Sequence, residues 1–367
     1  MSSFHKISDS RISINGTKIK NNLLFISSGI PSLDHIIGGG LPAGAIFVVE
    51  EDVLGSYSKI LCKYFLAEGI VSKHALFLAS ADDDPQETVK ALPQPCDVPM
   101  DNETTKITED IDRMKIAWRY EGLSQVDSSF GNNSTFGHHF DLSKHIDENT
   151  IKSSNISYCY LEPSENNNVD GFRNCLYSNL VHNIKNIVKK YKNNKSEDKN
   201  ILRICIQALG SPIWMAMDCE DGCHDSYGLD LIKFMYCLRI LLRDTNATAF
   251  ITMPSHLFED DHIMKRLLYS VDNAVRLESF TGSSKETNPV YKDYHGLFHI
   301  TKLSALYSMV PYIPPSIDLA FKLKRKKFVI EKLHLPPELQ ESSEREQDDI
   351  TSTPYTCGGF KKKDIDF

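Results

Sequence analysis

Short apolar runs alternate along this chain with longer segments in which apolar residues recur at helical spacing, a pattern typical of α/β domains. The runs predict strands at Ile46–Val49, Ala75–Ala79, Ile201–Ile206, Thr248–Met253 and Ala274–Leu277. The helical segments are Ile30–Ile37, Ser56–Glu68, Pro85–Leu92, Leu176–Tyr191, Leu229–Arg243 and Ile263–Ser270. Strands that alternate with helices predict a mostly parallel sheet with right-handed crossovers and helices on both faces.

Glycines and polar stretches divide the chain. Ser32 is the expected N-cap of the first helix, and Gly69 is the expected C-terminal stop of the helix that begins at Ser56. Residues 93–200 lose the regular alternation, and we expect insertions around the core there. Residues 1–22 and 337–367 are polar, so we expect disordered tails on either side of one domain at residues 23–336.

The segment Glu50–Tyr57 has the position of a phosphate-binding loop but lacks its chemistry. A working P-loop, G-x-x-x-x-G-K-[ST], uses glycines to turn backbone N–H groups toward phosphates, a lysine to neutralise them and a hydroxyl to hold magnesium. Counted from the end of the strand, Glu50 replaces the first glycine, Ser56 the lysine and Tyr57 the hydroxyl residue, and only Gly55 is retained.

Three carboxylates, from Glu50, Glu51 and Asp52, occupy the sequence positions where a triphosphate would lie. Each carboxylate about 4 Å from a phosphate charge costs on the order of 4 kcal/mol at an effective dielectric constant near 20. Micromolar binding is worth only about 8 kcal/mol, so we expect no conventional ATP binding. The alternative is that these acids form a solvated turn and merely favour the N-terminus of the next helix.

The second half of a P-loop site is also deficient. In P-loop proteins an acidic residue at the end of a buried strand helps to hold magnesium, whereas the strand at Ile201–Ile206 is followed by the neutral amide of Gln207. The alternative is that another strand carries this position. The loops after this strand and after Thr248–Met253, at Ala208–Trp214 and Ser255–His262, should lie at the carboxyl edge of the sheet, where α/β proteins bind ligands.

Composition limits the classes of function. The chain has 367 residues and a formal net charge of -8, which argues against a generally basic nucleic-acid coat. It carries 9 cysteines, an odd number typical of reduced thiols rather than of a disulfide framework. No signal peptide or membrane-spanning run is evident, so we expect a cytoplasmic and nuclear protein without membrane contact.

Two local clusters offer candidate sites. Cys219, Cys223 and His224 could supply zinc ligands, but no second cluster at zinc spacing accompanies them, so we expect an acidic loop and no metal site. Lysines at 189, 190, 192 and 195 are expected in a solvated connector, with an RNA-binding patch as the alternative. The densest basic group is Lys322, Lys324, Arg325, Lys326 and Lys327. It could protect an edge strand or contact RNA phosphates, and both interpretations stay open.

The stretch SSGIPSLDHIIGGGLPAGAIFVVEED at residues 27–52 resembles the opening of RecA-superfamily ATPase domains. Within that superfamily the chain resembles the family of fourth subunits of the Elongator complex. The resemblance rests on GIPSLDHIIGGGLPAG followed by EED, KYFLAEGIV, MKIAWRY, FGHHFD, LGSPIW, ITMPSHL, ETNPVYKDYHGL and LAFKLKRKKFVIEKLHLPP.

This resemblance implies a RecA-like fold with degenerate Walker A and Walker B motifs. It implies assembly with the fifth and sixth Elongator subunits into a heterohexameric ring that binds tRNA and attaches to a catalytic core. That core installs carboxymethyl-type side chains on wobble uridines, so we expect a non-catalytic subunit. The superfamily's loops that face the ring interior match residues 208–225 and 255–266, which makes Lys265 and Arg266 candidate tRNA contacts or simply exposed helix charges.

The family is also associated with ATP hydrolysis by the assembled ring. We expect no cofactor on this chain alone, because Glu50, Ser56 and Tyr57 leave only an unconventional site between subunits. The competing function is an active RecA- or KaiC-like ATPase that acts on nucleic acid, which the GGGLPAG lead-in favours and Ser56 opposes. A zinc-binding protein is a third, weaker hypothesis.

Overall fold

The computed structural model describes residues 14–20, 23–96, 137–160, 171–193, 200–214, 224–243, 245–258, 260–304 and 312–334. Its centre is a sheet with the strand order β14-β13-β12-β11-β4-β10-β9-β5-β8. The parallel part consists of β4 (Ile46–Glu50), β5 (Ala75–Ser80), β8 (Ile156–Cys159), β9 (Leu202–Gln207), β10 (Ala247–Met253) and β11 (Asn273–Ser279). The antiparallel end consists of β12 (Gly296–Lys302), β13 (Leu319–Leu323) and β14 (Phe328–Lys332).

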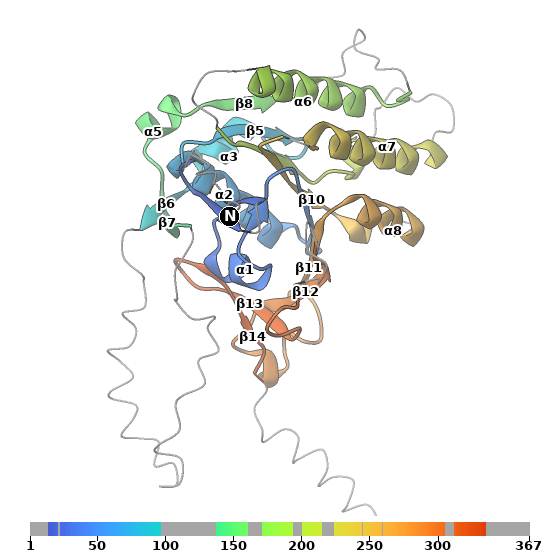
Figure 1. Ribbon diagram of the computed structural model, residues 1–367. Helices are drawn as coiled ribbons and strands as arrows, with labels where there is room; N and C mark the ends of the chain where they lie inside the picture. The colour runs from blue at the N-terminus through green and yellow to red at the C-terminus, as the bar shows by residue number, and fades with distance from the viewer. Residues whose placement is uncertain are drawn as a thin grey trace, which may run out of the picture.

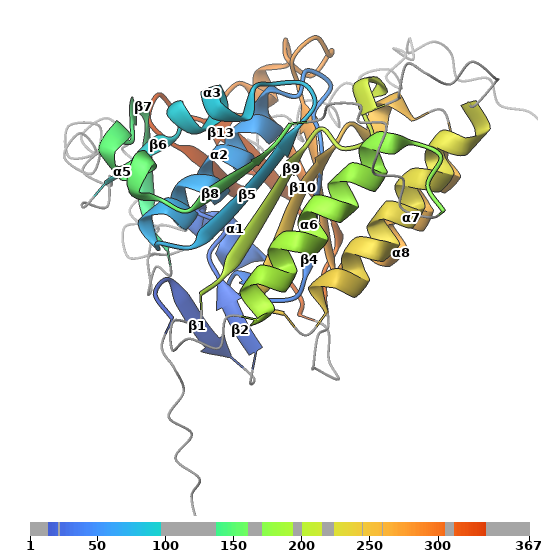
Figure 2. The ribbon, with the colours of Figure 1, turned by 90° about the horizontal axis from the view of Figure 1, so that it is seen from above.

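Helices cover both faces of this sheet, as Figures 1 and 2 show. One face carries α1 (Pro31–Ile36), α2 (Ser56–Val71) and α3 (Pro85–Lys90). The other carries α6 (Cys175–Asn193), α7 (His224–Leu242) and α8 (Asp261–Ser270), which lie side by side. Each layer has its own core of buried residues, because the parallel strands are apolar on both faces.

The central strand β4 lies between β11 and β10, and the loop after it leads directly into α2. Strands β9 and β5 follow β10 in the sheet, all parallel. This arrangement, with the phosphate-loop position after the central strand, is RecA-like. The predicted α/β class and RecA-like fold are confirmed, and the five predicted strands and six predicted helices all form, with ends shifted by a few residues.

The N-terminal region adds a small antiparallel sheet of β1 (Thr17–Lys20), β2 (Leu23–Ile26) and β3 (Leu41–Pro42). Disorder predicted through residue 22 is therefore wrong for Thr17–Lys20. The polar side chains of that strand face solvent, but its backbone pairs with β2, and His74 Nε2 contacts the carbonyl of Asn15 at 2.8 Å. Backbone pairing of this kind leaves little signal in a polar sequence.

The prediction that residues 93–200 are insertions around the core is wrong for two elements. Strand β8 joins the main sheet beside β5, and α6 packs on α7. The sheet's edge is therefore built from this region. Its other described elements include β6 (Pro93–Cys96), β7 (His139–His145) and the short helix α5 (Glu148–Ser153).

Three smaller expectations differ from the structure. Gly69 lies inside α2 rather than at its end. A Cβ added at this position would press on Leu76 and on Cδ of Arg203, so the glycine permits close packing there. Ser32 does not cap α1; Ile30 is the N-cap, and Pro31 begins the helix. Lysines 189, 190 and 192 lie in the last turns of α6 rather than in a connector, and position 195 lies outside the described residues.

Candidate functional site

The candidate site lies where β4, β5, β9 and β10 end together at the carboxyl edge of the sheet. Their register aligns Glu50 with Met253 and Ser80 with Gln207, so the loops that follow these strands meet at one edge. This is the position predicted from the sequence for ligand binding. The loop after β4 has the main role, because it leads into α2.

Asp52 fills the place where a phosphate would lie at the N-terminus of α2. Its Oδ1 accepts hydrogen bonds from the backbone N–H groups of Tyr57 and Ser58 at 3.1 and 3.2 Å. Its Oδ2 accepts from the backbone N–H of Ser56 at 3.1 Å and from the Ser56 hydroxyl at 3.3 Å. Asp52 is only 1% exposed, so its carboxylate satisfies the orphan donors of the helix from inside the protein.

The backbone of the loop makes this internal cap possible. Gly55 is the N-cap of α2 and has a φ of 64°, in the left-handed region that favours glycine, and its N–H donates to the carbonyl of Asp52 at 2.8 Å. The one retained P-loop glycine therefore keeps a backbone function. The sequence interpretation missed the cap, although the need of every helix N-terminus for acceptors was the signal that could have found it.

Tyr57 turns away from the loop, toward the antiparallel end of the sheet. Its ring lies 4.8 Å from the ring of Phe321 and 6.5 Å from that of Phe328, centroid to centroid. The residue at the magnesium-binding position thus packs in an aromatic cluster. No hydroxyl of the P-loop kind is presented to the site by this position.

The other two loop carboxylates have different surroundings. Glu50 is 7% exposed and accepts a hydrogen bond from the Thr301 hydroxyl at 3.1 Å. Burial raises the pKa of Glu51 to about 7, a hydrogen bond from Thr252 opposes the shift, and the charges of Asp82 and Asp52 add to it. Glu50 therefore bonds to β12, whereas the charges of Glu51 and Asp52 act on each other in the loop. The expectation that all three carboxylates lie together at the phosphate position is not met by Glu50. The three acids make the edge unfavourable for an anion in separate ways.

Gln207 lies at the end of β9, two strands from β4, where the second magnesium-site residue was predicted. It is 3% exposed, and its Oε1 accepts no hydrogen bond from the described part of the chain. A neutral amide supplies no charge to attract a metal. Nearby, Lys59 in the first turns of α2 pairs with Asp83 at 2.7 Å. Its charge also acts on Glu51 and Asp82, so this cation is shared among the carboxylates of the edge.

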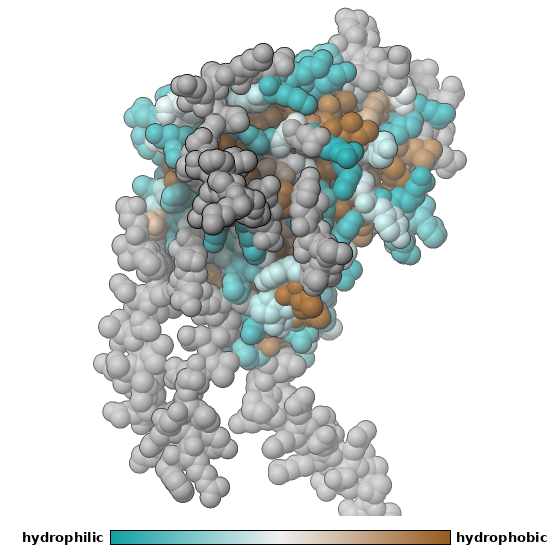
Figure 3. All heavy atoms as spheres, viewed as in Figure 1, coloured by the Kyte–Doolittle hydropathy of each residue, from teal (hydrophilic) through white to brown (hydrophobic). Residues whose placement is uncertain are grey.

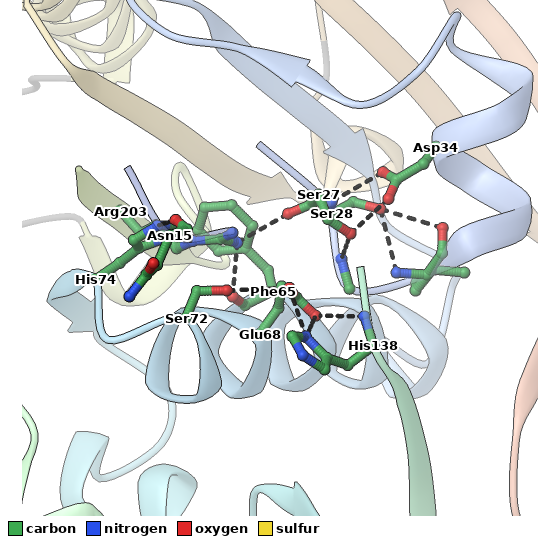
Figure 4. Close-up of polar contacts among 12 residues, drawn as sticks. Asn15, Ser27, Ser28, Asp34, Phe65, Glu68, Ser72, His74, His138 and Arg203 are labelled. Carbon is green, nitrogen blue, oxygen red and sulfur yellow. Dashed lines mark hydrogen bonds and ion pairs between the residues drawn. The ribbon is translucent and has the colours of Figure 1, made fainter. Parts of the chain in front are cut away.

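A second polar cluster, not anticipated from the sequence, lies at the opposite end of α2 (Figure 4). Arg203 on β9 is fully buried; its Nε donates to His74 Nδ1 at 2.9 Å, and its Nη1 donates to the carbonyls of Ser27 and Phe65 at 2.9 and 3.1 Å. Glu68 on α2, also fully buried, accepts from the backbone N–H of His138 at 3.0 Å. The cluster joins β9, α2, the N-terminal sheet and the start of β7.

Electrostatics of this buried cluster match a structural role. Burial raises the pKa of Asp34 to about 7, against hydrogen bonds from Ser27 and Ser28. Burial lowers the pKa of His74 to about 4, and the charge of Arg203 adds to the effect. Although burial raises the pKa of Glu68, the hydrogen bond with His138 and the charge of Arg203 lower it below its usual value. Breaking such a buried ionic network costs several kcal/mol, typically about 3–5.

The predicted basic residues do not form one surface. Lys265 and Arg266 are exposed on α8, whereas the basic hairpin turn joins β13 and β14 on the side of α2. Lys322 is paired with Glu331 at 2.5 Å and lies over the ring of Tyr294, which favours the structural interpretation for that residue. Lys324, Arg325 and Lys326 are exposed, and Lys327 is half-buried.

The candidate metal and membrane features fall only partly within the described residues. Cys219 and Cys223 lie outside the described residues, as does the side chain of His224, so the zinc hypothesis stays a prediction. Among the residues that the structure does describe, no group of His, Cys, Asp or Glu side chains could hold a metal ion. In the same part of the chain, no helix combines the length and the hydrophobicity needed to cross a bilayer.

Comparison with known proteins places the chain in a family. The family model described as PAXNEB protein matches residues 10–367. Elongator complex protein 4 of Xenopus laevis is 41% identical over 343 residues, which cover 89% of this chain and 83% of that protein. Elongator complex protein 4 of Mus musculus is 40% identical over 382 residues, which cover 97% and 89%.

Similarity extends to more distant relatives and to a solved structure. Elongator complex protein 4 of Saccharomyces cerevisiae is 25% identical over 376 residues, with coverage of 86% of this chain and 75% of the relative. The crystal structure of the KaiC-like protein PH0186 from Pyrococcus horikoshii superposes with a TM-score of 0.44 at 14% identity, covering 83% of this chain and 98% of that one. On the family match and the relatives at 40% identity, the chain belongs to the PAXNEB family, whose relatives named above are Elongator complex protein 4.

Proposed function

We propose that this chain is a non-catalytic subunit of the Elongator complex that supports carboxymethyl-type modification of wobble uridines in tRNA. In this proposal it forms a heterohexameric RecA-like ring with the fifth and sixth Elongator subunits, and the ring binds tRNA and attaches to the catalytic core. The protein acts in the cytoplasm and nucleus. Its relatives' names support the Elongator role.

One observation carries the non-catalytic assignment: the carboxylate of Asp52 lies against the N–H groups of α2 that would otherwise receive a phosphate. A nucleotide would have to displace a buried, four-times hydrogen-bonded carboxylate and would then meet Glu51, with Ser56 in place of the P-loop lysine. Any ATP effect of the ring must therefore use an unconventional site between subunits.

The carboxyl edge is better suited to contact with a protein than with a nucleotide. Exposed apolar side chains surround the Asp52 loop: Val53 and Leu54 are 70% and 66% exposed, and Ile213 and Leu257, from the loops after β9 and β10, are 57% and 50% exposed. We assign this edge to a neighbouring ring subunit, since burial of apolar side chains drives association.

The tRNA contacts are assigned to Lys265 and Arg266. They are exposed in α8, which follows the loop after β10 and so lies near the same carboxyl edge. The hairpin residues Lys324, Arg325, Lys326 and Lys327 lie at the β13–β14 turn, on the side of α2.

Ring assembly tests the edge assignment. The paired change Val53→Glu and Leu54→Glu, introduced into the chain co-expressed with the fifth and sixth subunits, should shift native mass from a hexamer to smaller species. The matched control is Tyr269→Glu on α8, where an apolar ring that is 82% exposed lies away from the loop. Assembly that survives the first change as well as the control contradicts the edge assignment.

Loss of the chain tests the function itself. Deletion should abolish carboxymethyl-type wobble uridines, measured by mass spectrometry of digested tRNA, and the wild-type chain should restore them. The proposal fails if modification persists without the chain, or if the purified chain stays monomeric beside the fifth and sixth subunits. ATP turnover by the isolated chain that is lost on Gly55→Ala would instead support the ATPase hypothesis.

A further inference from the structure

A basic groove lies between the β13–β14 turn, α2 and the β6–β7 pair. Its volume is about 350 Å³, and it is lined by Ile60, Lys63, Ala91, Pro93, Leu142, His145, Leu323, Lys324 and Arg325. The backbone N–H of Leu142 donates to the carbonyl of Lys326 at 2.8 Å, which holds β7 against the hairpin turn. The groove is therefore formed by elements that are bonded to one another.

Charge in this groove is of one sign. None of the lining residues is acidic, and in the described part of the chain no carboxylate lies within ion-pair distance of Lys63 or Arg325. This contrasts with the whole chain, whose formal net charge is -8. A local positive patch on an acidic protein attracts an anionic occupant.

The floor of the groove indicates which kind of anion fits. Ile60, Leu142 and Leu323 are aliphatic, Ala91 and Pro93 add apolar surface, and none of the lining residues is Phe, Tyr or Trp. Single-stranded nucleic acids bind mainly through bases stacked on aromatic side chains, which this floor lacks. An acidic peptide that also carries aliphatic side chains matches both the rim and the floor.

The chain itself contains such a peptide close to the groove. Glu338–Asp349 is its densest acidic stretch, with six carboxylates, one arginine and the aliphatic Leu339. Strand β14 begins at Phe328, next to the turn, and ends at Lys332. The distance from the turn to the end of the strand is therefore about 14 Å, at roughly 3.4 Å per residue. Residues 335–349 can span about 50 Å at roughly 3.5 Å each, so the stretch can reach.

We propose that Glu338–Asp349 docks in this groove of the same chain, with carboxylates against Lys63, Lys324 and Arg325 and with Leu339 on the aliphatic floor. A tether this short gives an effective concentration of about a millimolar, so weak exposed ion pairs suffice for occupancy. The docked peptide shields the groove from RNA and other polyanions.

Photo-cross-linking of the full chain tests this contact directly. With p-benzoylphenylalanine in place of His145 at the rim, irradiation should cross-link the groove to residues 338–349 within one chain, seen at monomer mass and mapped by mass spectrometry. The same label in place of Tyr269, exposed on α8, is the matched control and should yield at least fivefold less of this product.

Charge variants then establish the cause. Two variants of the full chain should each lower the yield of the cross-link at least fivefold. The first reverses the charge of the groove, with Arg325→Glu and Lys324→Glu. The second neutralises the acidic stretch, with Glu338, Glu341, Glu344 and Glu346 changed to Gln and Asp348 and Asp349 changed to Asn. Both sets change residues at the surface or outside the described part of the chain, and unchanged circular dichroism verifies the fold. The proposal is overturned if residues 338–349 cross-link no better from position 145 than from 269, or if neutralisation leaves the yield unchanged. It is also overturned if added tRNA or another subunit takes the label in preference.

The cross-link within the chain does not depend on the Elongator assignment, because it is measured on the isolated chain before tRNA or another subunit is added. A second readout does depend on it: the neutralised chain, assembled in its ring, should bind tRNA at least threefold more tightly at low salt, and Arg325→Glu should remove the gain. A ring that binds no tRNA in any form would contradict the proposed function while leaving the cross-link result intact.

Discussion

At the start of α2, three backbone N–H groups and one hydroxyl converge on the carboxylate of Asp52. Caps of this kind contribute about 0.5–2 kcal/mol, so Asp52→Ala should lower the free energy of unfolding by about 2 kcal/mol, measured by urea denaturation. Asp52→Asn keeps one oxygen acceptor and should cost less.

Asp83→Asn is the matched control for this prediction, because Asp83 shares an exposed ion pair with Lys59 and caps no helix. Exposed pairs are worth about 0–1 kcal/mol, so the control should remain close to wild type. Equal stability of Asp52→Ala and Asp83→Asn would show that the internal cap has no energetic role.

Glu51 gives the stability a pH dependence. Its pKa is about 7 in the folded chain, above the usual 4.5, so the folded state binds more protons than the unfolded chain between about pH 4.5 and 7. Stability from this group is fully present below pH 4.5 and is lost as pH rises through 7.

Glu51→Gln removes that dependence. Between pH 5 and pH 8, the free energy of unfolding of the variant should rise by about 1–2 kcal/mol relative to that of the wild type, measured by denaturant unfolding at both pH values. The pKa of Asp34 is also raised to about 7, so the free energy of unfolding of both proteins still falls in part as the pH rises. A difference between variant and wild type that does not change with pH would contradict the assignment.

At the scale of elements, apolar periodicity predicted the strands and helices of the parallel core because their residues are buried on fixed faces. It failed at β1, whose exposed Lys18 and Lys20 carry no burial pattern, and at the sheet membership of β8, a four-residue strand. The site's position at the carboxyl edge was predictable from β4 and β10. The direction of each loop carboxylate was not, since it depends on backbone dihedrals such as that of Gly55.

Gly69 shows how packing overrides propensity inside α2. Gly→Ala within a helix usually stabilises it by about 0.5–1 kcal/mol. Here the added methyl group would press on Leu76 and Arg203, so Gly69→Ala should instead destabilise the protein by about 1–3 kcal/mol in urea unfolding. A stabilised variant would mean that the contact relaxes freely.

At the scale of the whole molecule, the sheet separates two surfaces. The outer face of α7 and α8 exposes Tyr236, Ile240 and Tyr269 at 62%, 58% and 82%, and Figure 3 shows hydrophobic side chains at the surface around α7. The α8 cations Lys265 and Arg266 belong to this side, whereas the groove of Lys324 and Arg325 belongs to the side of α2. A single tRNA held at the carboxyl edge beside α8 therefore need not reach the groove.

Salt dependence of tRNA binding distinguishes the two surfaces. Each neutralised phosphate contributes about -0.7 to -0.9 to the slope of log K against log salt. In the assembled ring, Lys265→Ala with Arg266→Ala should therefore reduce the magnitude of the slope by up to about 1.8 for each copy that contacts the RNA. Two control variants should leave the slope unchanged. Lys190→Ala with Lys192→Ala removes two exposed charges from α6, which lies on the same face of the sheet as α8, and Lys324→Ala with Arg325→Ala removes two charges from the groove. If only the groove variant lowers the slope, the tRNA lies on the α2 side, and both the α8 assignment and the shielding of the groove are wrong.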